Sequence, residues 1–220
     1  MEWKESSLSD LASRALSQEL PAASNVFIND ICEDSRRVTP GALFVAVPST
    51  NADGSQFVVD AVSRGARAVV VDESSSVRAI VPVLRVKDPR QAVAKLASAL
   101  FGLDEIQRRG ELRTIGITGT NGKSTIAFMI RHLLARSGRS SALCGTIEYD
   151  LVSRKLGSDL TTPDAVTLSK HLIESHSAGA RHAVLEVSSH SLDQRRVDGI
   201  AFSIGIFTNC LLYTSPSPRD

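Results

Sequence analysis

Residues 114–125 carry the side chains best suited to phosphate chemistry, and they read Thr-Ile-Gly-Ile-Thr-Gly-Thr-Asn-Gly-Lys-Ser-Thr. Glycines here let backbone amides approach phosphate oxygens without a Cβ clash, and a helix beginning at Lys123 adds a positive partial charge. Lys123 can reach the β- and γ-phosphates, and the hydroxyl of Ser124 suits Mg²⁺. The predicted ATP-binding residues are Gly119, Thr120, Asn121, Gly122, Lys123, Ser124 and Thr125.

The spacing of these glycines differs from that of the common phosphate-binding loop, which places four residues between its first Gly and Gly-Lys. Here Gly119 precedes Gly122 by three positions, and Gly116 lies six positions before Gly122. The alternative interpretation is a glycine-rich turn between a strand and a helix, with no ligand. That alternative does not account for Lys-Ser-Thr at the helix start, so nucleotide binding is favoured.

A carboxylate suited to the same chemistry is Glu186, which lies at the end of an apolar run that begins at His182. In phosphate-loop enzymes an acid at the end of such a strand reaches Mg²⁺, directly or through water. Taken alone, Glu186 could instead cap a neighbouring helix. We predict Lys123 and Glu186 as catalytic residues, with Ser124 and Glu186 as Mg²⁺ ligands.

The elements that must position these residues alternate between strands and helices, which is typical of an α/β fold. Continuous apolar runs predict strands that are covered on both faces. The runs lie at 66–71, 81–86, 114–118, 182–187 and 202–208. Apolar residues at helical spacing predict helices at 8–16, at 91–101 and from 123 onwards. Thr161-Thr162-Pro163-Asp164 predicts a further helix with threonine as its N-cap, and residues 188–191 predict a loop.

The polar stretch 102–110 is interpreted as a linker, which puts a domain boundary near Gly110. We therefore predict a small α/β domain at 1–110. It is followed at 111–209 by the first part of a P-loop, mainly parallel-sheet ATPase domain.

Composition excludes several classes of protein. The net charge of +1 gives no sign of a nucleic-acid or membrane partner. Cys32, Cys144 and Cys210 are odd in number and far apart, which predicts reduced thiols in the cytoplasm without a zinc site. No apolar run is long enough to cross a membrane or to form a signal peptide.

Four motifs, in this order and spacing, resemble the Mur ligase family of peptidoglycan synthesis, from about Leu8 to Asn209. The motifs are Asp34-Ser-Arg with Leu43-Phe-Val-Ala46, Gly116 to Thr125, Thr161-Thr-Pro163, and Glu186-Val-Ser-Ser-His190. The last two, with Gln194 and Arg196 downstream, resemble the MurE type within that family. Taken alone, Asp34-Ser-Arg would be a capped turn with a surface ion pair.

This resemblance implies an ATP-dependent amide ligase that adds a third amino acid to UDP-MurNAc-L-Ala-D-Glu through an acyl phosphate. ATP and Mg²⁺ are the implied cofactors, a free amino acid is the second substrate, and a monomer is expected. The domain at 1–110 would bind the UDP end of the muramoyl substrate. The implied substrate-binding residues are Glu33, Ser35, Thr50, Asn51, Ala52, Thr161, Thr162, Ser188, Gln194 and Arg196.

The stretch 210–220 departs from the family pattern, and we expect it to be a non-native tail. The family's later metal-binding histidine, its carbamylated lysine and its C-terminal domain have no counterpart in this sequence. We therefore expect that the chain alone does not form the tripeptide product. The alternatives are a MurF-like ligase, another P-loop enzyme, or a non-catalytic remnant that binds a UDP-sugar or a nucleotide.

Overall fold

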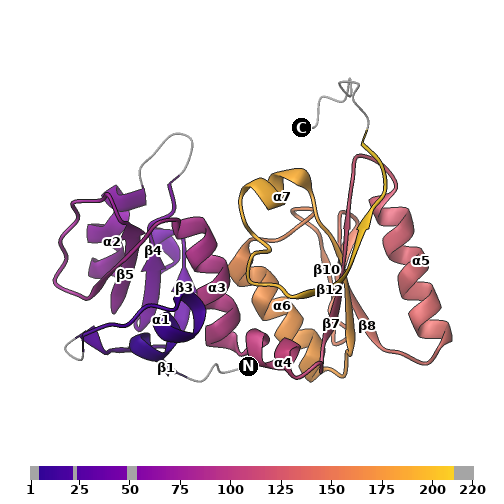
Figure 1. Ribbon diagram of the computed structural model, residues 1–220, viewed down its shortest axis with the longest axis horizontal. Helices are drawn as coiled ribbons and strands as arrows, with labels where there is room; N and C mark the ends of the chain where they lie inside the picture. The colour runs from indigo at the N-terminus through magenta and orange to yellow at the C-terminus, as the bar shows by residue number, and fades with distance from the viewer. Residues whose placement is uncertain (1–4, 22–23, 49–53, 211–220) are drawn as a thin grey trace.

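The computed structural model describes residues 5–21, 24–48 and 54–210 and contains two main sheets with helices between and around them, together with one short two-stranded pair (Figure 1). Thr50, Asn51 and Ala52, and the predicted tail from 211 onwards, lie outside the described residues. Figure 1 shows the smaller sheet on the left and the larger sheet on the right, with α3 (Pro89–Phe101) and α6 (Ala165–Ser177) between them.

The smaller sheet has four parallel strands in chain order, and alternate residues of its strands enter different cores. The strands are β3 (Asp30–Cys32), β4 (Ala42–Val45), β5 (Ala68–Asp72) and β6 (Val83–Val86). Leu43 and Val45 join the cluster that contains α1 (Leu8–Leu16) and α3. Phe44 joins the cluster that contains α2 (Val58–Ser63) on the other face. Burial on both faces explains the continuous apolar runs.

Short elements complete this part of the chain. They are β1 (Ser6–Ser7), which pairs with β2 (Phe27–Ile28), and the 3-10 helices η2 (Ser35–Arg37) and η3 (Gly54–Phe57). The helix predicted at 8–16 is confirmed as α1, and Ser7 caps it by accepting from the amide of Asp10.

The prediction of a linker at 102–110 was wrong, because α4 (Leu103–Arg108) occupies it. Leu103 is fully buried, and Ile106, one helical turn later, packs against the same core. Two apolar residues spaced by three are enough to anchor one turn among charged neighbours.

The larger sheet has six strands in the order β10-β9-β8-β11-β7-β12. Their bounds are β7 (Arg113–Thr118), β8 (Ser141–Cys144), β9 (Glu148–Asp150), β10 (Lys155–Gly157), β11 (His182–Glu186) and β12 (Phe202–Phe207). Strands β8, β11, β7 and β12 are mutually parallel, and β9 and β10 form an antiparallel extension. The predicted mainly parallel sheet is confirmed. It carries α5 (Lys123–Arg136) on one side and α6 on the other, with α7 (Ser189–Asp193) near the carboxyl ends of the strands (Figure 1).

Three local expectations in this part were wrong. Asp164, and not a threonine, caps α6, since its side chain accepts from the amide of Thr167. Residues 189–193 form the short helix α7 instead of a loop, with Ser188 as its N-cap. The strand predicted at 202–208 exists as β12, but it is the edge strand of the sheet and most of its residues are exposed.

The two sheets share one apolar core through the helices between them. Helix α3 packs against α6, and one cluster of buried side chains includes Leu8 and Leu96 as well as Leu172 and Leu185. The shared core therefore holds the smaller sheet and the larger sheet together through α3 and α6. Among the described helices, none combines the length and the apolar composition needed to cross a bilayer.

Candidate active site

The phosphate loop joins β7 to α5 in a conformation that depends on two glycines. Gly119 has φ 127° and Gly122 has φ 84°, values that L-residues with a Cβ rarely adopt. The Lys123 ammonium donates to the carbonyl oxygens of Gly119 at 2.8 Å and Thr120 at 3.2 Å. An ammonium has three donors, so one remains for a phosphate oxygen at the N-terminus of α5.

The two residues that follow β12 form hydrogen bonds with this loop. The amides of Thr120 and Asn121 donate to the backbone and side-chain oxygens of Asn209, both at 3.0 Å. The hydroxyl of Thr208 donates to the Asn121 carbonyl at 2.6 Å. A Cβ on Gly119 would lie 2.2 Å from that hydroxyl oxygen. Sequence reasoning missed Thr208 and Asn209 as loop partners; the available signal was that β12 is parallel to β7 and ends beside it.

Glu186 is the buried centre of the site, with 1% of its surface exposed. Its carboxylate accepts from the Ser124 hydroxyl at 2.8 Å and from the amide and hydroxyl of Thr146, both at 3.1 Å. A Cβ on Gly145 would lie 2.2 Å from a carboxylate oxygen of Glu186, so glycine is required there. Thr146 was also missed, although it follows β8, the strand next to β11.

These oxygens fit a magnesium ion by their chemistry. Mg²⁺ is held by one or two carboxylates together with hydroxyls, phosphates and water, and not by an all-protein cage. Ser124 and Glu186 offer such a donor pair beside the phosphate loop. Within the described part of the chain, no cluster of three or more His, Cys, Asp or Glu side chains could hold a metal ion. A two-oxygen site completed by nucleotide phosphates requires no such cluster.

Four of the predicted substrate residues gather around the end of β11. Thr162 is 2% exposed, and its hydroxyl donates to the Glu186 carbonyl at 2.8 Å while accepting from the Ser188 amide at 3.2 Å. The hydroxyls of Thr161 and Thr146 lie 3.1 Å apart and share a hydrogen bond. The guanidinium of Arg196 donates to the Thr162 carbonyl at 3.1 Å. Through Thr146, the hydroxyl of Thr161 is connected to the Glu186 carboxylate.

A small cleft of about 140 Å³ brings Glu33 together with Gln194 and Arg196. It is lined by Glu33, Val47, Arg90, Val93, Asp164, Ala165, Gln194 and Arg196. Ser35, by contrast, is buried and does not line this cleft. Its hydrogen bond to Asp60 is the main cause that lowers the pKa of that carboxyl.

Glu33 lines both this small cleft and a second, larger one, although the residue as a whole is exposed. Loss of solvation there raises the pKa of Glu33 to about 7, and the nearby Asp164 carboxylate raises it further, whereas Arg196 and Arg90 act in the opposite direction. Glu33 therefore changes charge near neutral pH.

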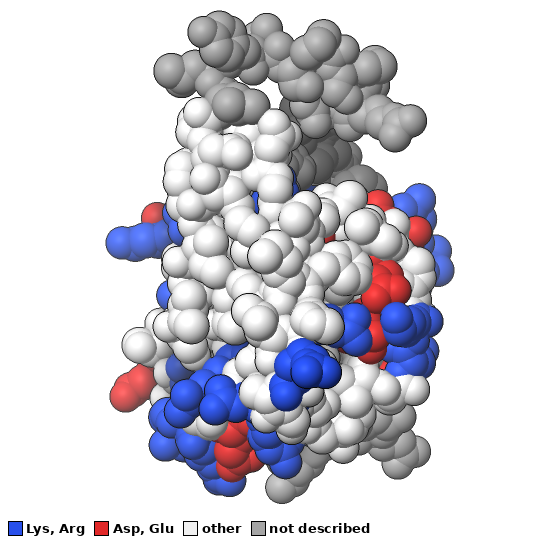
Figure 2. Space-filling view, turned by 90° about the vertical axis from the view of Figure 1, so that its right-hand side faces the viewer, with Lys and Arg blue, Asp and Glu red and all other residues white. Residues whose placement is uncertain are grey.

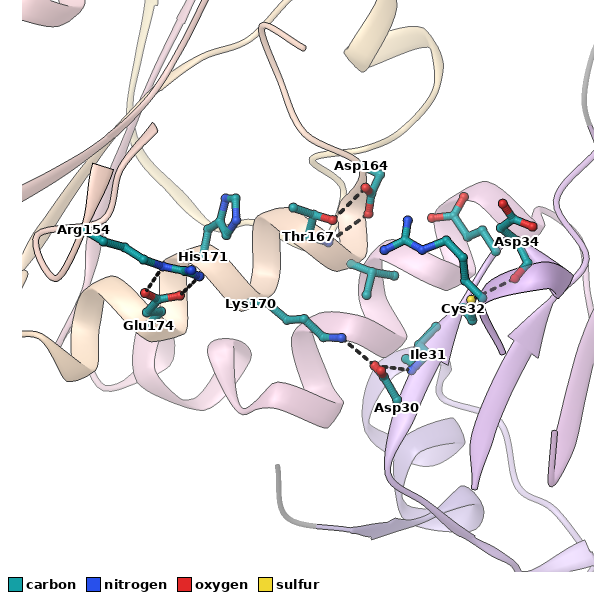
Figure 3. Close-up of a pocket in the computed structure, with 13 residues that line it drawn as sticks. Asp30, Ile31, Cys32, Asp34, Arg154, Asp164, Thr167, Lys170, His171 and Glu174 are labelled. Atoms are coloured by element: carbon teal, nitrogen blue, oxygen red, sulfur yellow. Dashed lines mark hydrogen bonds and ion pairs between the residues drawn. The ribbon is translucent and has the colours of Figure 1, made fainter. Parts of the chain in front are cut away.

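A larger cleft of about 820 Å³ lies between the edge strand β3 and helix α6 (Figure 3). Across it, Lys170 pairs with Asp30 at 2.8 Å, and the Lys170 ammonium lies 5.1 Å from the centre of the Phe101 ring. Arg154 pairs with Glu174 on the wall formed by α6. The ion pair joins α6, a helix that packs on the larger sheet, to β3 of the smaller sheet.

The fold and the loop define an α/β nucleotide-binding protein of the P-loop kind. Two family patterns then match the chain: one described as the Mur ligase middle domain, at residues 117–211, and one described as the Mur ligase family, catalytic domain, at residues 28–100. The chain belongs to the Mur ligase family.

Curated relatives agree with this assignment. The UDP-N-acetylmuramoyl-L-alanyl-D-glutamate--2,6-diaminopimelate ligase of Rhizobium meliloti is 43% identical over 187 residues, covering 85% of this chain and 37% of the relative. The protein of the same name from Agrobacterium fabrum is 44% identical over 182 residues, covering 83% of this chain and 36% of the relative. The chain thus spans well under half the length of these relatives.

Solved structures give the same family. A structure of a UDP-N-acetylmuramoyl-L-alanyl-D-glutamate--2,6-diaminopimelate ligase matches with a TM-score of 0.77 at 27% identity, covering 96% of this chain and 42% of that one. A crystal structure of MurF from Acinetobacter baumannii matches with a TM-score of 0.55 at 19% identity, covering 86% of this chain and 37% of that one. The second likeness concerns the fold alone.

Proposed function

We propose that the chain provides the ATP-binding and muramoyl-binding part of an ATP-dependent acid–amino-acid ligase. The whole enzyme would join a third amino acid to UDP-MurNAc-L-Ala-D-Glu. The observation that carries the proposal is the 2.8 Å contact between Ser124 and Glu186, placed beside Thr162 and Arg196. The relatives' names give 2,6-diaminopimelate as the amino acid, and we take it as the proposed amine substrate.

The proposed reaction begins with the D-glutamate carboxylate, a poor electrophile. Its attack on the γ-phosphorus of ATP forms an acyl phosphate and releases ADP. The amine then attacks the acyl carbon, loses a proton, and expels phosphate, so that an amide bond replaces the C–O bond to phosphate. The first step requires two anions side by side, which makes positioning and charge stabilisation the main tasks of the protein.

The residues of this chain suit those tasks. Lys123 and the N-terminus of α5 would offset the negative charge that accumulates between ATP and the carboxylate. When bound at Ser124 and Glu186, Mg²⁺ would neutralise phosphate charge and orient the nucleotide. Thr161, Thr162, Ser188, Gln194 and Arg196 would hold the muramoyl peptide next to the phosphate loop.

We place the UDP end of the substrate on a domain at 1–110 and ATP on a domain at 111–209. Support comes from the cleft in which Glu33, from the first, faces Gln194 and Arg196, from the second. Because Ser35 is buried, we propose that it acts indirectly, by holding its loop in place beside the uridine. Thr50, Asn51 and Ala52 are the other proposed uridine contacts. The three free cysteines fit a cytoplasmic setting.

Calorimetry tests the proposal. We expect the chain to bind UDP-MurNAc-L-Ala-D-Glu more tightly than UDP-N-acetylglucosamine, and to bind ATP only weakly when Mg²⁺ is omitted. Glu186→Gln should weaken the Mg²⁺ dependence of ATP binding, whereas Glu148→Gln, on β9, should leave it unchanged. Equal affinities for the two UDP-sugars would refute the muramoyl assignment.

A further inference from the structure

Arg195 directly follows the C-cap of α7 and has φ 54°, in the left-handed region. Its amide donates to the Leu192 carbonyl at 3.0 Å, and the Arg196 amide donates to the Ser191 carbonyl at 2.9 Å. This is the hydrogen-bond pattern of a helix that ends in a left-handed residue, a position where glycine is usual. Arginine is a costly choice for the backbone, so its side chain is the feature to explain.

The side chain of Arg195 ties the end of α7 to the beginning of α3. Its Nε lies 2.6 Å from an Asp88 carboxylate oxygen, and its Nη1 lies 3.0 Å from Asp198. Asp88 is also the N-cap of α3, because it accepts from the amides of Arg90 and Gln91. The Gln91 side chain in turn donates to Asp198 at 3.3 Å. A closed ring of contacts therefore joins α3 to the segment after α7.

The same two segments both supply residues that line the small cleft. Arg90 and Val93 come from α3, and Gln194 and Arg196 flank Arg195 in the chain. Arg195 itself does not line that cleft. Its contacts thus fix the separation of the walls from outside the binding surface.

We propose that Arg195 is a positioning residue for the muramoyl substrate. Its ion pair with Asp88 keeps Gln194 and Arg196 facing α3, and so raises the fraction of molecules whose cleft is ready to bind. When that fraction falls, the apparent affinity falls in proportion. This inference rests on the proposed function, in that the cleft takes the UDP-muramoyl dipeptide.

The competing explanation is an ordinary surface ion pair, since the Arg195 and Asp88 side chains are 45% and 36% exposed. Such a pair would affect stability without discriminating between ligands. The test must therefore compare two ligands and must preserve the cap of α3. Asp88→Asn does so, because asparagine is as good an N-cap as aspartate, while it removes the charge that Arg195 contacts.

The experiment measures dissociation constants for UDP-MurNAc-L-Ala-D-Glu and for ATP with Mg²⁺ by calorimetry. Arg195→Gln and Asp88→Asn should each weaken the muramoyl ligand about three- to tenfold and leave ATP within about twofold. The double variant should lose no more than either single variant. Arg195→Lys should recover part of the affinity, and Arg195→Gly, which suits the backbone, should not. Arg109→Gln, which removes another exposed arginine paired with two carboxylates, is the matched control.

Equal losses for both ligands, additive losses in the double variant, or no loss would overturn the inference. A second readout separates it from the proposed function. Residual dipolar couplings of the ligand-free protein should show α7 reoriented relative to α3 in Arg195→Gln but not in Arg109→Gln. Unchanged couplings would contradict the positioning role. Failure of the unsubstituted chain to bind the muramoyl ligand would refute the proposed function instead.

Discussion

At the scale of single residues, the site is built from polar groups that are already hydrogen-bonded before any ligand arrives. The Lys123 ammonium is held by two loop carbonyls, and the Glu186 carboxylate is held by Ser124 and Thr146. Such contacts orient side chains in advance, so less freedom is lost when a nucleotide binds. The loop is therefore preorganised for the phosphate groups that we propose it binds.

Lys123→Ala should weaken ATP binding by about ten- to hundredfold, because a hydrogen bond to a charged group contributes about 1.5–3 kcal/mol. The fold should survive, since Lys123 bonds only to carbonyls of its own loop. Titration of ATP with Mg²⁺ by calorimetry checks the affinity, and circular dichroism checks the fold. Lys155→Ala, on the β10 surface, is the control. Unchanged affinity in Lys123→Ala would remove the loop from the ATP site.

The titration of Glu33 should be visible in the pH dependence of stability. Its pKa rises from 4.5 to about 7 in the folded protein, so the folded state holds this proton more tightly than the unfolded chain does. Stability must therefore fall as the pH rises through the window from 4.5 to about 7. Glu33→Gln cannot ionise, so its Tm should exceed that of the unsubstituted protein at pH 8 and match it only below about pH 4, under the unfolded pKa. Parallel Tm curves for the two proteins across this pH range would contradict this.

Residue types alone were sufficient to select Lys123, Ser124 and Glu186, because few other side chains can do phosphate chemistry in that order. The structure places all three at the same loop, and their roles stay predictions. Thr146 and Asn209 could not be found in the same way. Their roles depend on which strands are neighbours in the sheet, and that is decided by packing far along the chain. The sequence around Thr146 does not indicate that its side chain contacts the carboxylate of Glu186.

At the scale of elements, Thr162 connects the start of the segment leading into α6 with the end of β11. Its hydroxyl both donates to Glu186 and accepts from Ser188. Since Ser188 also caps α7, one buried side chain links three elements at the edge of the site. The Thr162 hydroxyl thus contributes to the fold through its two backbone hydrogen bonds, independently of any substrate.

Thr162→Val should destabilise the protein by about 1–3 kcal/mol, because it leaves a buried carbonyl and a buried amide without partners while conserving volume. For a chain of this size the Tm should fall by about 3–9 °C. Thermal unfolding followed by circular dichroism measures the change. Thr39→Val, in an exposed turn, should shift Tm by less than about 1 °C. A fall no larger than that in Thr162→Val would show that the hydroxyl bonds contribute little.

The strands and longer helices were predictable because their apolar patterns repeat over many residues. The missed helices α4 and α7 are each shorter than two turns, so their sequences are too short to show a helical period of apolar residues. The misplaced cap of α6 has another cause. At α6, both threonine and aspartate can serve as N-caps. The choice of Asp164 depends on Thr162 being drawn into the Glu186 network, which local sequence does not reveal.

At the scale of the whole molecule, apolar side chains are exposed on the outer side of α5 and along the edge strand β12. In α5 only Ala127 is buried, while Met129 and Leu133 are 60% and 65% exposed, and Phe207 at the end of β12 is 67% exposed. Figure 2 shows this side of the molecule, with a broad area free of charged side chains. Exposed apolar surface beside a free strand edge favours self-association.

The chain should therefore scatter light increasingly as its concentration is raised. Ile204→Lys places a charge on the exposed edge strand β12 and should reduce that scattering without lowering Tm by more than about 1 °C. Static light scattering over a concentration series makes the measurement. Val59→Lys, an exposed apolar residue on α2, should have little effect. A similar reduction in both variants would show that the edge strand is not responsible.

At the scale of the whole chain, we propose that one scaffold places a muramoyl cleft and an ATP loop next to each other. Amide chemical-shift mapping with UDP-MurNAc-L-Ala-D-Glu, and then with ATP and Mg²⁺ added, is the decisive measurement. We expect the first ligand to shift Glu33, Gln194 and Arg196 together, and the nucleotide to shift Gly122 and Lys123. Shifts from the muramoyl ligand confined to residues beyond 110 would contradict it.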